Sequence, residues 1–390
     1  MTKIKINLKK EIDNSYNIKF IENTWNELSD YLLSVNKNKI LIVSDTNVFP
    51  LHYNNLISEI DRKISVKNII LEAGEEKKNI EAVLKICSKL IELKFNRNDL
   101  LVVLWWGVIW DITWMVASIF KRWIDFIQIP TTLLSMFDSS VWWKTGVDFE
   151  GVKNIIWAFK QPKLVLINSN YLETLPKQEK YSWYFEWLKH SLLENKEYYE
   201  EFKKDWDIFL SKELTNKNSP IIPFHKGDEQ VNQIISKNVS VKARIVMEDE
   251  KEMWVRKFLN YWHTFWHSLE SITNFELPHW ICVWYWMIYV NILSNKLWFL
   301  NKKYLEEINN FIKTKILESW FNFKKINLDE KIENNFEKIY SKMISDKKNI
   351  DSNISFVLLE KPWKLFIEKI WEDKKFFLEE SFYEFVKNVK

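Results

Sequence analysis

Residues 100–111, Leu-Leu-Val-Val-Leu-Trp-Trp-Gly-Val-Ile-Trp-Asp, decide the fold class of this chain. The segment begins with an unbroken apolar run, which is typical of a buried strand in a parallel sheet. A tight turn follows, and the next residues have helical spacing until about Arg122. A strand, a turn and a helix in this order predict one repeat of a doubly wound α/β domain.

The alternation of strands and helices continues on both sides of this segment and ends at about residue 176. Further strands are predicted at 39–45, 68–71 and 126–129, and an amphipathic helix is predicted at 79–94. Beyond about residue 176 strands become rare, and helical spacing dominates 178–213, 229–248, 254–273 and 280–299. We therefore expect a Rossmann-like α/β domain over 1–170, followed by a mostly α-helical domain over 171–390.

Charge and cysteine content exclude several classes of protein. The 56 basic and 53 acidic residues nearly cancel, which argues against a nucleic-acid partner or an anionic membrane surface. The N-terminus lacks the apolar region of a signal peptide, and no uncharged apolar run approaches a membrane span. Cys87 and Cys282 form no CxxC motif, so a reducing cytoplasmic location is expected.

Tryptophan and glycine occur in abnormal numbers. The chain has 22 Trp and 5 Gly, and together they make up about the 7% share that glycine alone normally has. Trp105-Trp106-Gly107 follows a strand, and Trp142-Trp143 follows Asp138-Ser139-Ser140, where tight turns require a residue without Cβ. The pattern indicates UGA codons that are read as glycine in some bacteria but are written here as Trp. The alternative is a protein that is naturally rich in tryptophan.

Two motifs point to a phosphorylated ligand. With glycine restored, 101–111 becomes a strand, a glycine-rich turn and a helix, which suits a dinucleotide pyrophosphate at the helix N-terminus. Thr131-Thr132 and Asp138-Ser139 then precede Lys144, giving hydroxyls, a carboxylate and a cation near a second glycine pair. These groups suit a dinucleotide and an anionic substrate.

Histidines gather in the second half of the chain. His263 and His267 form an HxxxH motif that places both imidazoles on one helix face, and His279 follows. Neutral imidazoles with a carboxylate such as Glu186, which lies near His190, are good zinc ligands. Spacing alone favours His263 and His267 as the ligand pair.

With W read as G, four strings resemble the 3-dehydroquinate synthase family. They are VVLWWGVIWD (102–111), RWIDFIQIPTTLLSMFDSSVWWKTGV (122–147), KNIIWAFKQP (153–162) and RKFLNYWHTFWHSLES (256–271). The resemblance runs from about Asp45 to Lys348. Val152 departs from it, because the family often has glycine before Lys153-Asn154 and no Trp explains the difference.

The resemblance implies three sets of site residues. The metal ligands, for Zn²⁺ or alternatively Co²⁺, would be Glu186, His263 and His279, with His267 near the substrate phosphate. NAD would be held by Asp45, Asn47, Glu75, Lys78, Trp105, Trp106, Gly107, Asp111, Thr131, Thr132, Leu134, Asp138, Ser139, Lys153, Asn154, Thr174, Leu175 and Glu179. Substrate and catalysis would involve Lys144, Asn154, Lys189, Lys242, Glu252, Arg256, Asn260, His267 and Lys348 (or Lys347), with Arg122 supplied by a neighbouring subunit.

The implied enzyme is a homodimer that acts on a sugar phosphate. It would convert 3-deoxy-D-arabino-heptulosonate 7-phosphate to 3-dehydroquinate and phosphate, a step of aromatic amino acid biosynthesis. The 1–170 domain would bind the dinucleotide, and the 171–390 domain would bind metal and substrate. The alternatives are another sugar phosphate cyclase, a metal-dependent polyol dehydrogenase, or a non-catalytic protein whose Trp residues are real.

Overall fold

The computed structural model describes residues 13–105, 107–141, 144–150, 152–175, 177–215, 229–249, 258–259, 277, 279–318, 335–344 and 354–389. The chain divides into two compact units. The first comprises Met1–Thr174 with Phe224–Ser236, and the second comprises Leu175–Pro223 with Lys237–Lys390. The first unit is built on a parallel sheet and the second on helices, which confirms the predicted fold class.

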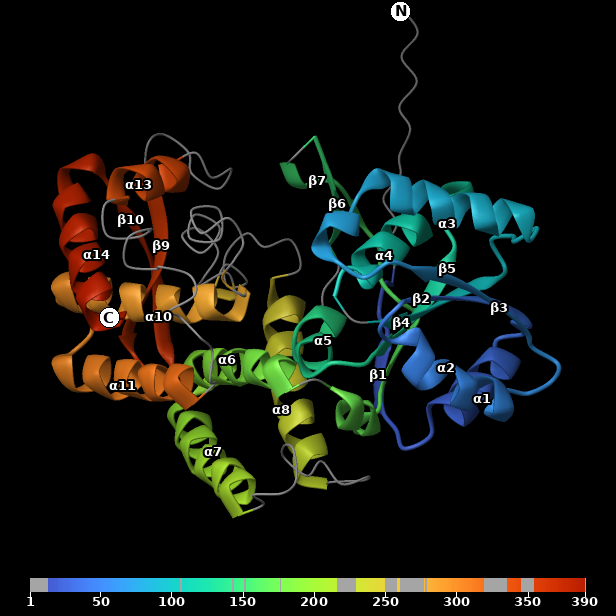
Figure 1. The fold of residues 1–390 in the computed structure, drawn as a ribbon, viewed down its shortest axis with the longest axis horizontal. Helices are drawn as coiled ribbons and strands as arrows, with labels where there is room; N and C mark the ends of the chain where they lie inside the picture. Colours follow the sequence, from blue (N-terminus) through green and yellow to red (C-terminus); the bar gives the residue numbers. More distant parts are fainter. Residues whose placement is uncertain are drawn as a thin grey trace, which may run out of the picture. The chain divides into compact units, whose positions relative to one another are not determined.

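The first unit contains a six-stranded sheet in the order β1-β8-β5-β4-β2-β3, with every neighbouring pair parallel (Figure 1). Its strands are β1 (Asn17–Phe20), β2 (Lys39–Asp45), β3 (Ser65–Leu71), β4 (Leu100–Trp105), β5 (Asp125–Pro130) and β8 (Leu164–Ile167). The strands predicted at 39–45, 68–71, 100–104 and 126–129 are confirmed as β2 to β5. β1 and β8 have only four residues each, too few to give a periodic signal.

Helices cover both faces of this sheet. α3 (Ile80–Glu92) and α4 (Ile109–Ile119) lie on one face, and α1 (Thr24–Ser34) and α2 (Phe49–Glu59) lie on the other (Figure 1). α3 buries Val83, Ile86 and Leu90 at helical spacing, and the side chain of Asn79 caps its N-terminus. An antiparallel hairpin, β6 (Lys144–Phe149) and β7 (Val152–Phe159), follows the short helix α5 (Leu133–Phe137).

The strand order reverses between β2 and β4. From β2 the chain runs to β3 on one side, and from β4 it runs to β5 on the other side. In open parallel sheets, the carboxyl ends of the strands at such a reversal form a crevice in which ligands bind. The tertiary topology therefore places a candidate site where β2 and β4 end.

The second unit is mainly helical. It contains α6 (Lys177–Glu194), α7 (Lys196–Thr215), most of α8 (Glu229–Glu248), α10 (His279–Lys296), α11 (Lys302–Glu318), α13 (Phe336–Ile344) and α14 (Lys375–Val389). The helix expected over 178–213 is two helices. α6 ends at Glu194, and the side chain of Asn195 accepts a hydrogen bond from the backbone N–H of Tyr198 at the start of α7. The helix expected over 254–273 falls almost entirely outside the described residues.

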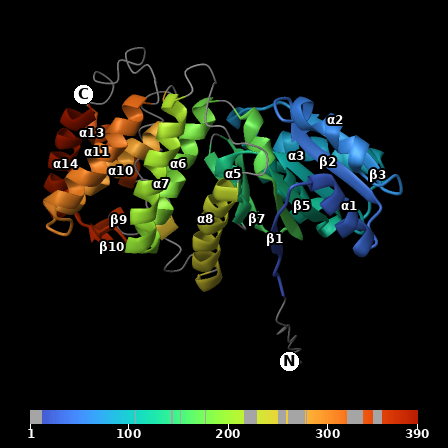
Figure 2. The same ribbon diagram turned by 90° about the horizontal axis from the view of Figure 1, so that it is seen from below.

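α10 forms the core of the second unit, and residues 281–293 of this helix are buried on every side. It lies among α6, α11, α14 and the hairpin of β9 (Ile354–Lys361) and β10 (Lys364–Ile370) (Figure 2). Tyr289 donates a hydrogen bond to the carbonyl of Leu378 on α14, and Ser294 accepts one from the N–H of Leu359 on β9. Within the described part of the chain, no helix has the length and apolar character needed to cross a membrane.

Candidate active site

Two predicted NAD-binding segments meet where the strand order reverses. The register of β2 and β4 pairs Ile40 with Leu100 and Val43 with Val103, so that Asp45 and Trp105 end their strands side by side. Asp45 is 1% exposed, and its Oδ1 accepts hydrogen bonds from the backbone N–H of Asn47 at 2.7 Å and Val48 at 2.9 Å. The buried carboxylate fixes this turn and leaves Asn47 exposed above the strand ends.

The turn after β4 leads into an uncapped helix. Gly107 has φ +63°, and Val108, the residue before α4, provides no side-chain cap for the helix. The first N–H groups of α4 therefore lack side-chain acceptors among the described residues, and an anion suits this position. Both the N–H and the hydroxyl of Thr131 donate to the carbonyl of Trp105, at 3.2 Å and 2.8 Å. Thr131 thereby ties the end of β5 to this turn.

The indole of Trp105 lies in the hydrophobic core of the first unit. It is 1% exposed and packs against Trp110, with ring centroids 5.6 Å apart. Its Nε1 has no hydrogen-bond partner within the described part of the chain. A buried N–H without an acceptor is unfavourable, so the described residues of this turn do not suit an indole. Trp106, also predicted to line the cofactor, lies outside the described residues.

Lys78 and Asp111, both predicted to bind NAD, form a buried ion pair. Lys78 Nζ lies 2.6 Å from Asp111 Oδ2, and the side chains are 8% and 9% exposed. Burial works against the charge of Lys78, yet the carboxylates of Asp111, Glu75 and Asp148 raise its pKa above the usual value. The lysine therefore keeps its positive charge beside the first turn of α4.

The β6–β7 hairpin holds this pair in place. Asp111 accepts from the hydroxyl of Thr145 at its carbonyl (2.6 Å) and from the N–H of Gly146 at Oδ1 (3.2 Å). The N–H of Asp148 donates to the carbonyl of Lys78 at 2.9 Å. Thr145 and Asp148 were not singled out from the sequence, because their part is set by contacts with residues far away in the chain.

The same hairpin carries other predicted residues. The N–H of Asn154, which has φ +50°, donates to Asp148 Oδ1 at 2.7 Å. Lys153 Nζ lies 3.7 Å from Glu75 Oε1, so that two exposed residues predicted to bind NAD are brought together. Lys144 begins β6, and its side chain is not described.

The segment after β5 uses its hydroxyls locally. Thr132 caps α5 in a capping box with Ser135, accepting from the N–H of Ser135 at 3.1 Å. Leu134 lies in α5, and its carbonyl accepts from the N–H of Asp138, after which Ser139 opens a short 3-10 helix. The predicted cofactor run therefore follows the end of β5, the strand next to β4.

Thr174 ends the first unit beside a buried histidine. Its hydroxyl donates to the carbonyl of Tyr171 at 3.0 Å and lies 3.2 Å from His52 Nε2. His52 is 8% exposed, and burial lowers its pKa to about 4. Leu175, the next predicted residue, is buried at 6% exposure. The side chain of Glu179 is not described.

A polar cluster lies on α6 in the second unit. Glu186, Lys189 and His190 share one helix face through their spacing. Glu186 forms an ion pair with Lys189, and a carboxylate oxygen of Glu186 lies within 4.8 Å of a ring nitrogen of His190. Asn238 on α8 binds His190, with Oδ1 at 2.9 Å from Nδ1. Two lysines here are buried. Lys189 on α6 is 3% exposed, and Lys242 on α8 is 0% exposed.

The predicted metal set is only partly described. Glu186 lies in this cluster. His279 is the first residue of α10, but its side chain is not described. His263 lies outside the described residues. Several substrate residues also lie outside them, namely Glu252, Arg256, Asn260, His267 and Lys348. His190 was noted in the sequence near Glu186 but was not assigned as a ligand. The spacing of four residues between this carboxylate and this imidazole, which places them on one helix face, was the signal that could have indicated it.

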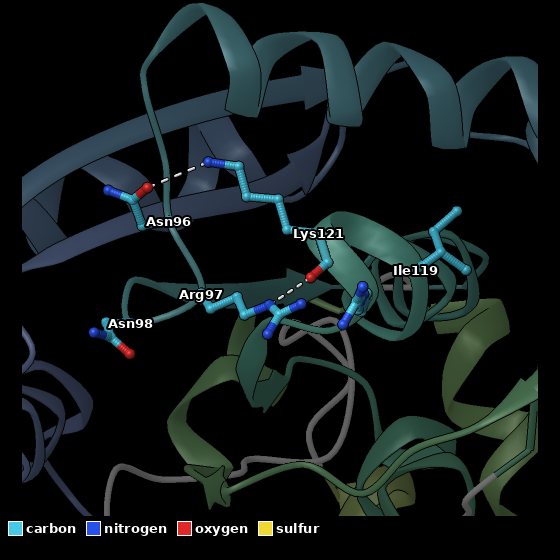
Figure 3. Close-up of a pocket in the computed structure, with 6 residues that line it drawn as sticks. Asn96, Arg97, Asn98, Ile119 and Lys121 are labelled. Atoms are coloured by element: carbon cyan, nitrogen blue, oxygen red, sulfur yellow. Dashed lines mark hydrogen bonds between the residues drawn. The ribbon is translucent and has the colours of Figure 1, made fainter.

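Arg122 lines a surface pocket of about 920 Å³ in the first unit. Figure 3 shows this pocket with the lining residues Asn96, Arg97 and Lys121. Lys121 and Arg122 both have left-handed backbones, with φ +47° and +80°. Lys121 donates to the carbonyl of Phe95 at 2.7 Å, and Arg97 Nε donates to the carbonyl of Lys121 at 2.5 Å. These bonds hold the turn rigidly and leave Arg122 exposed in the pocket.

Comparison with known proteins agrees with this arrangement. Models of the 3-dehydroquinate synthase N-terminal and C-terminal domains match residues 68–182 and 184–349. A 3-dehydroquinate synthase of Acetivibrio thermocellus is 36% identical over 365 residues, covering 93% of this chain and 93% of the relative.

Solved structures show the same fold. A 2-deoxy-scyllo-inosose synthase, solved with carbaglucose-6-phosphate, NAD⁺ and Co²⁺, has a TM-score of 0.76 at 19% identity and covers 95% of this chain and 97% of its own. A 2-epi-5-epi-valiolone synthase of Streptomyces hygroscopicus, solved with NAD⁺ and Zn²⁺, has a TM-score of 0.78 at 18% identity, with 98% and 99% covered. Sequence and domain matches together show that this chain belongs to the 3-dehydroquinate synthase family.

Proposed function

We propose that the protein converts 3-deoxy-D-arabino-heptulosonate 7-phosphate to 3-dehydroquinate and phosphate, as its family relatives are named for doing. The match to these relatives covers both units of the chain. The structural observation that carries the proposal is the pair of buried lysines, Lys189 and Lys242. Both lysines already have partners within the protein, which is Glu186 in the case of Lys189. Two ammonium groups held in the helical part of the chain suit a substrate that carries both a carboxylate and a phosphate.

NAD would bind at the carboxyl ends of β2 and β4. The uncapped N-terminus of α4 suits the pyrophosphate, and Asn47 is exposed beside it. Lys78 brings a positive charge to the first turn of α4, held there by Asp111. The residues present therefore fit a dinucleotide, with binding assigned to 1–170.

The metal would be held by the helical part of the chain, assigned to 171–390. Glu186 supplies an oxygen ligand, and His263 and His279 remain the proposed nitrogen ligands for Zn²⁺ or Co²⁺. The closeness of a Glu186 oxygen and a His190 ring nitrogen on one face of α6 supports this position. Bound NAD and metal would supply reversible hydride transfer and polarisation of a substrate hydroxyl.

The chain's own residues would orient the substrate. Lys189 pairs with Glu186, so its ammonium lies at the metal side of the α6 face. Lys242 adds a second buried cation on α8. Holding both anionic ends of the substrate fixes its reacting carbons, which allows elimination of phosphate and the closing aldol step to proceed largely through positioning.

We also propose a homodimer in the cytoplasm, in which Arg122 reaches the phosphate bound by the partner subunit. Three observations support it. Arg122 is exposed, its turn is fixed by Arg97 and Lys121, and its pocket is open and cationic. A guanidinium is the side chain best suited to two-point contact with phosphate.

The proposed reaction is tested by phosphate release with NAD⁺ and Zn²⁺ present. The heptulosonate phosphate is compared with sedoheptulose 7-phosphate, which lacks the carboxylate, and with glucose 6-phosphate. The chain as written and a chain with glycine at the Trp positions are assayed in parallel. Release from the heptulosonate alone supports the proposal, whereas a folded, NAD-binding chain that prefers either other sugar contradicts it.

A further inference from the structure

Trp298 occupies a helix end that is built for glycine. After α10, the N–H of Trp298 donates to the carbonyl of Asn295 at 2.9 Å, and the N–H of Phe299 donates to that of Ser294 at 2.9 Å. These two bonds define a Schellman motif, in which the residue after the C-cap is left-handed and is usually glycine. Trp298 is that residue, and its φ is +61°.

Little compensates for tryptophan at this position, where the indole makes an edge contact with the ring of Phe377, with centroids 5.7 Å apart. The side chain of Trp298 is 82% exposed, so the indole gains little burial in return for the strained backbone. The next residue, Phe299, packs on the hairpin instead, with its ring 4.6 Å from that of Phe366 on β10. The helix end is therefore complete without any side chain at residue 298.

Trp363 repeats the pattern in a hairpin. β9 and β10 pair Lys361 with Lys364, leaving Pro362 and Trp363 in the turn. Proline followed by a residue with positive φ is the sequence of a type II turn, whose third position favours glycine. Trp363 has φ +65°, and its N–H is held by the carbonyl of Leu192 at 2.8 Å. A bulky residue at such a φ is an outlier.

Crowding in the cores points the same way. The ring centroids of Phe185 on α6 and Trp284 on α10 lie 3.3 Å apart at an interplanar angle of 53°. Aromatic pairs prefer roughly 4.5–7 Å, so this helix contact is too close for two rings of this size. Trp105 presents the related problem of a buried indole N–H without a described partner.

We infer that the natural protein carries glycine at residues 298 and 363, encoded by UGA that its source reads as glycine. The backbone at both places has the conformation that glycine adopts freely and tryptophan does not. The same reassignment accounts for the crowding at Trp284 and for the scarcity of glycine, with 5 residues against 22 Trp. None of these observations depends on the reaction that the protein catalyses.

The direct test is the composition of the protein made in its own cells. Peptides spanning residues 298 and 363 are analysed by tandem mass spectrometry, and the gene is sequenced at both codons. We expect glycine residues and UGA codons. Tryptophan in both peptides, or UGG at both codons, would overturn the inference, whether or not the protein is active.

Variants of the full chain test the backbone argument separately. We expect W298G and W363G each to raise the midpoint of thermal unfolding, by about 2–4 °C, because glycine relieves the left-handed strain. W298A removes the same indole but keeps Cβ, so it should recover less of the shift. W371G is the matched control, since Trp371 is 53% exposed at φ −89°, where glycine brings no relief. Equal shifts for W298A and W298G would show that φ is not the cause.

Discussion

Lys78 Nζ and Asp111 Oδ2 lie 2.6 Å apart between the loop before α3 and the first turn of α4, and neither side chain is more than 9% exposed. The pair joins two segments that are separate in the sequence and lie at the proposed cofactor site. The hairpin residues Thr145, Gly146 and Asp148 bind the same two residues. Removal of the Lys78–Asp111 ion pair should therefore affect both the stability of the protein and its binding of NAD.

Replacing Asp111 with alanine should destabilise the protein by about 3–5 kcal/mol, because it leaves the Lys78 ammonium buried without its partner. The matched control is E92Q, which breaks the pair of Lys89 and Glu92, 2.7 Å long but with side chains 34% and 63% exposed. That change should cost less than about 1 kcal/mol. Urea unfolding of both variants measures the two losses of unfolding free energy. Similar losses would contradict a special role for the buried pair.

His52 should make the protein lose stability in acid. Burial lowers the pKa of His52 to about 4, so the unfolded chain takes up this proton at a higher pH than the folded one. Stability should therefore fall as pH drops from roughly 6.5 to about 4, by about 3.4 kcal/mol at most from this residue. In H52Q, which keeps a polar group near Thr174, that part of the slope should disappear. An unchanged slope between the two pH values would refute this assignment.

Glu186 should be required for metal binding under the proposed function. E186Q removes the charge of the carboxylate and should lower zinc affinity at least about tenfold, measured as bound zinc after dialysis. E194Q is the control, because Glu194 is on the same helix but pairs with Arg244 instead. N238A should show an intermediate loss if His190 helps to hold the metal. Equal zinc content in E186Q and wild type would contradict the proposed ligand.

Glycine at residue 105 should improve NAD binding. Trp105 is a buried residue at the end of β4 whose indole Nε1 has no partner among the described residues. Glycine there would give the turn the backbone freedom that a close approach of phosphate to the N–H groups of α4 requires. We expect W105G, alone or with W106G, to tighten NAD⁺ binding at least about tenfold by calorimetry, or about 1.4 kcal/mol. W123G, which changes an exposed residue beside Arg122, should leave the affinity as it was. No gain with W105G would count against the proposed pyrophosphate position.

Arg122 should act in the neighbouring subunit. R122A and K242M should each be inactive alone, but a refolded equimolar mixture should regain about a quarter of the normal activity, since half of the random dimers contain one intact site. R122K is expected to keep partial activity, because a single charge replaces two-point contact. If the mixture stays inactive while the dimer forms, Arg122 serves its own subunit's site or none.

Much of the fold was accessible from local sequence alone. Unbroken apolar runs identified β2, β4 and β5, and helical spacing identified α3, α8 and α10, because periodicity and burial are properties of a few adjacent residues. The hairpin of β9 and β10 was missed, since its strands follow long helices and alternate only weakly. Charge and cysteine content likewise restricted the class of protein without any knowledge of the fold.

Tertiary structure decided the rest. The order β3-β2-β4-β5, which sets Asp45 beside Trp105 at a reversal, arises from pairing between distant segments and leaves no local mark in the sequence. The Lys78–Asp111 pair and the His190–Asn238 contact also depend on such pairing. Composition by itself indicated that tryptophan stands where glycine belongs. Only the folded backbone identified Trp298 and Trp363 as positions that require glycine, because φ at a turn is set by the hydrogen bonds that close it.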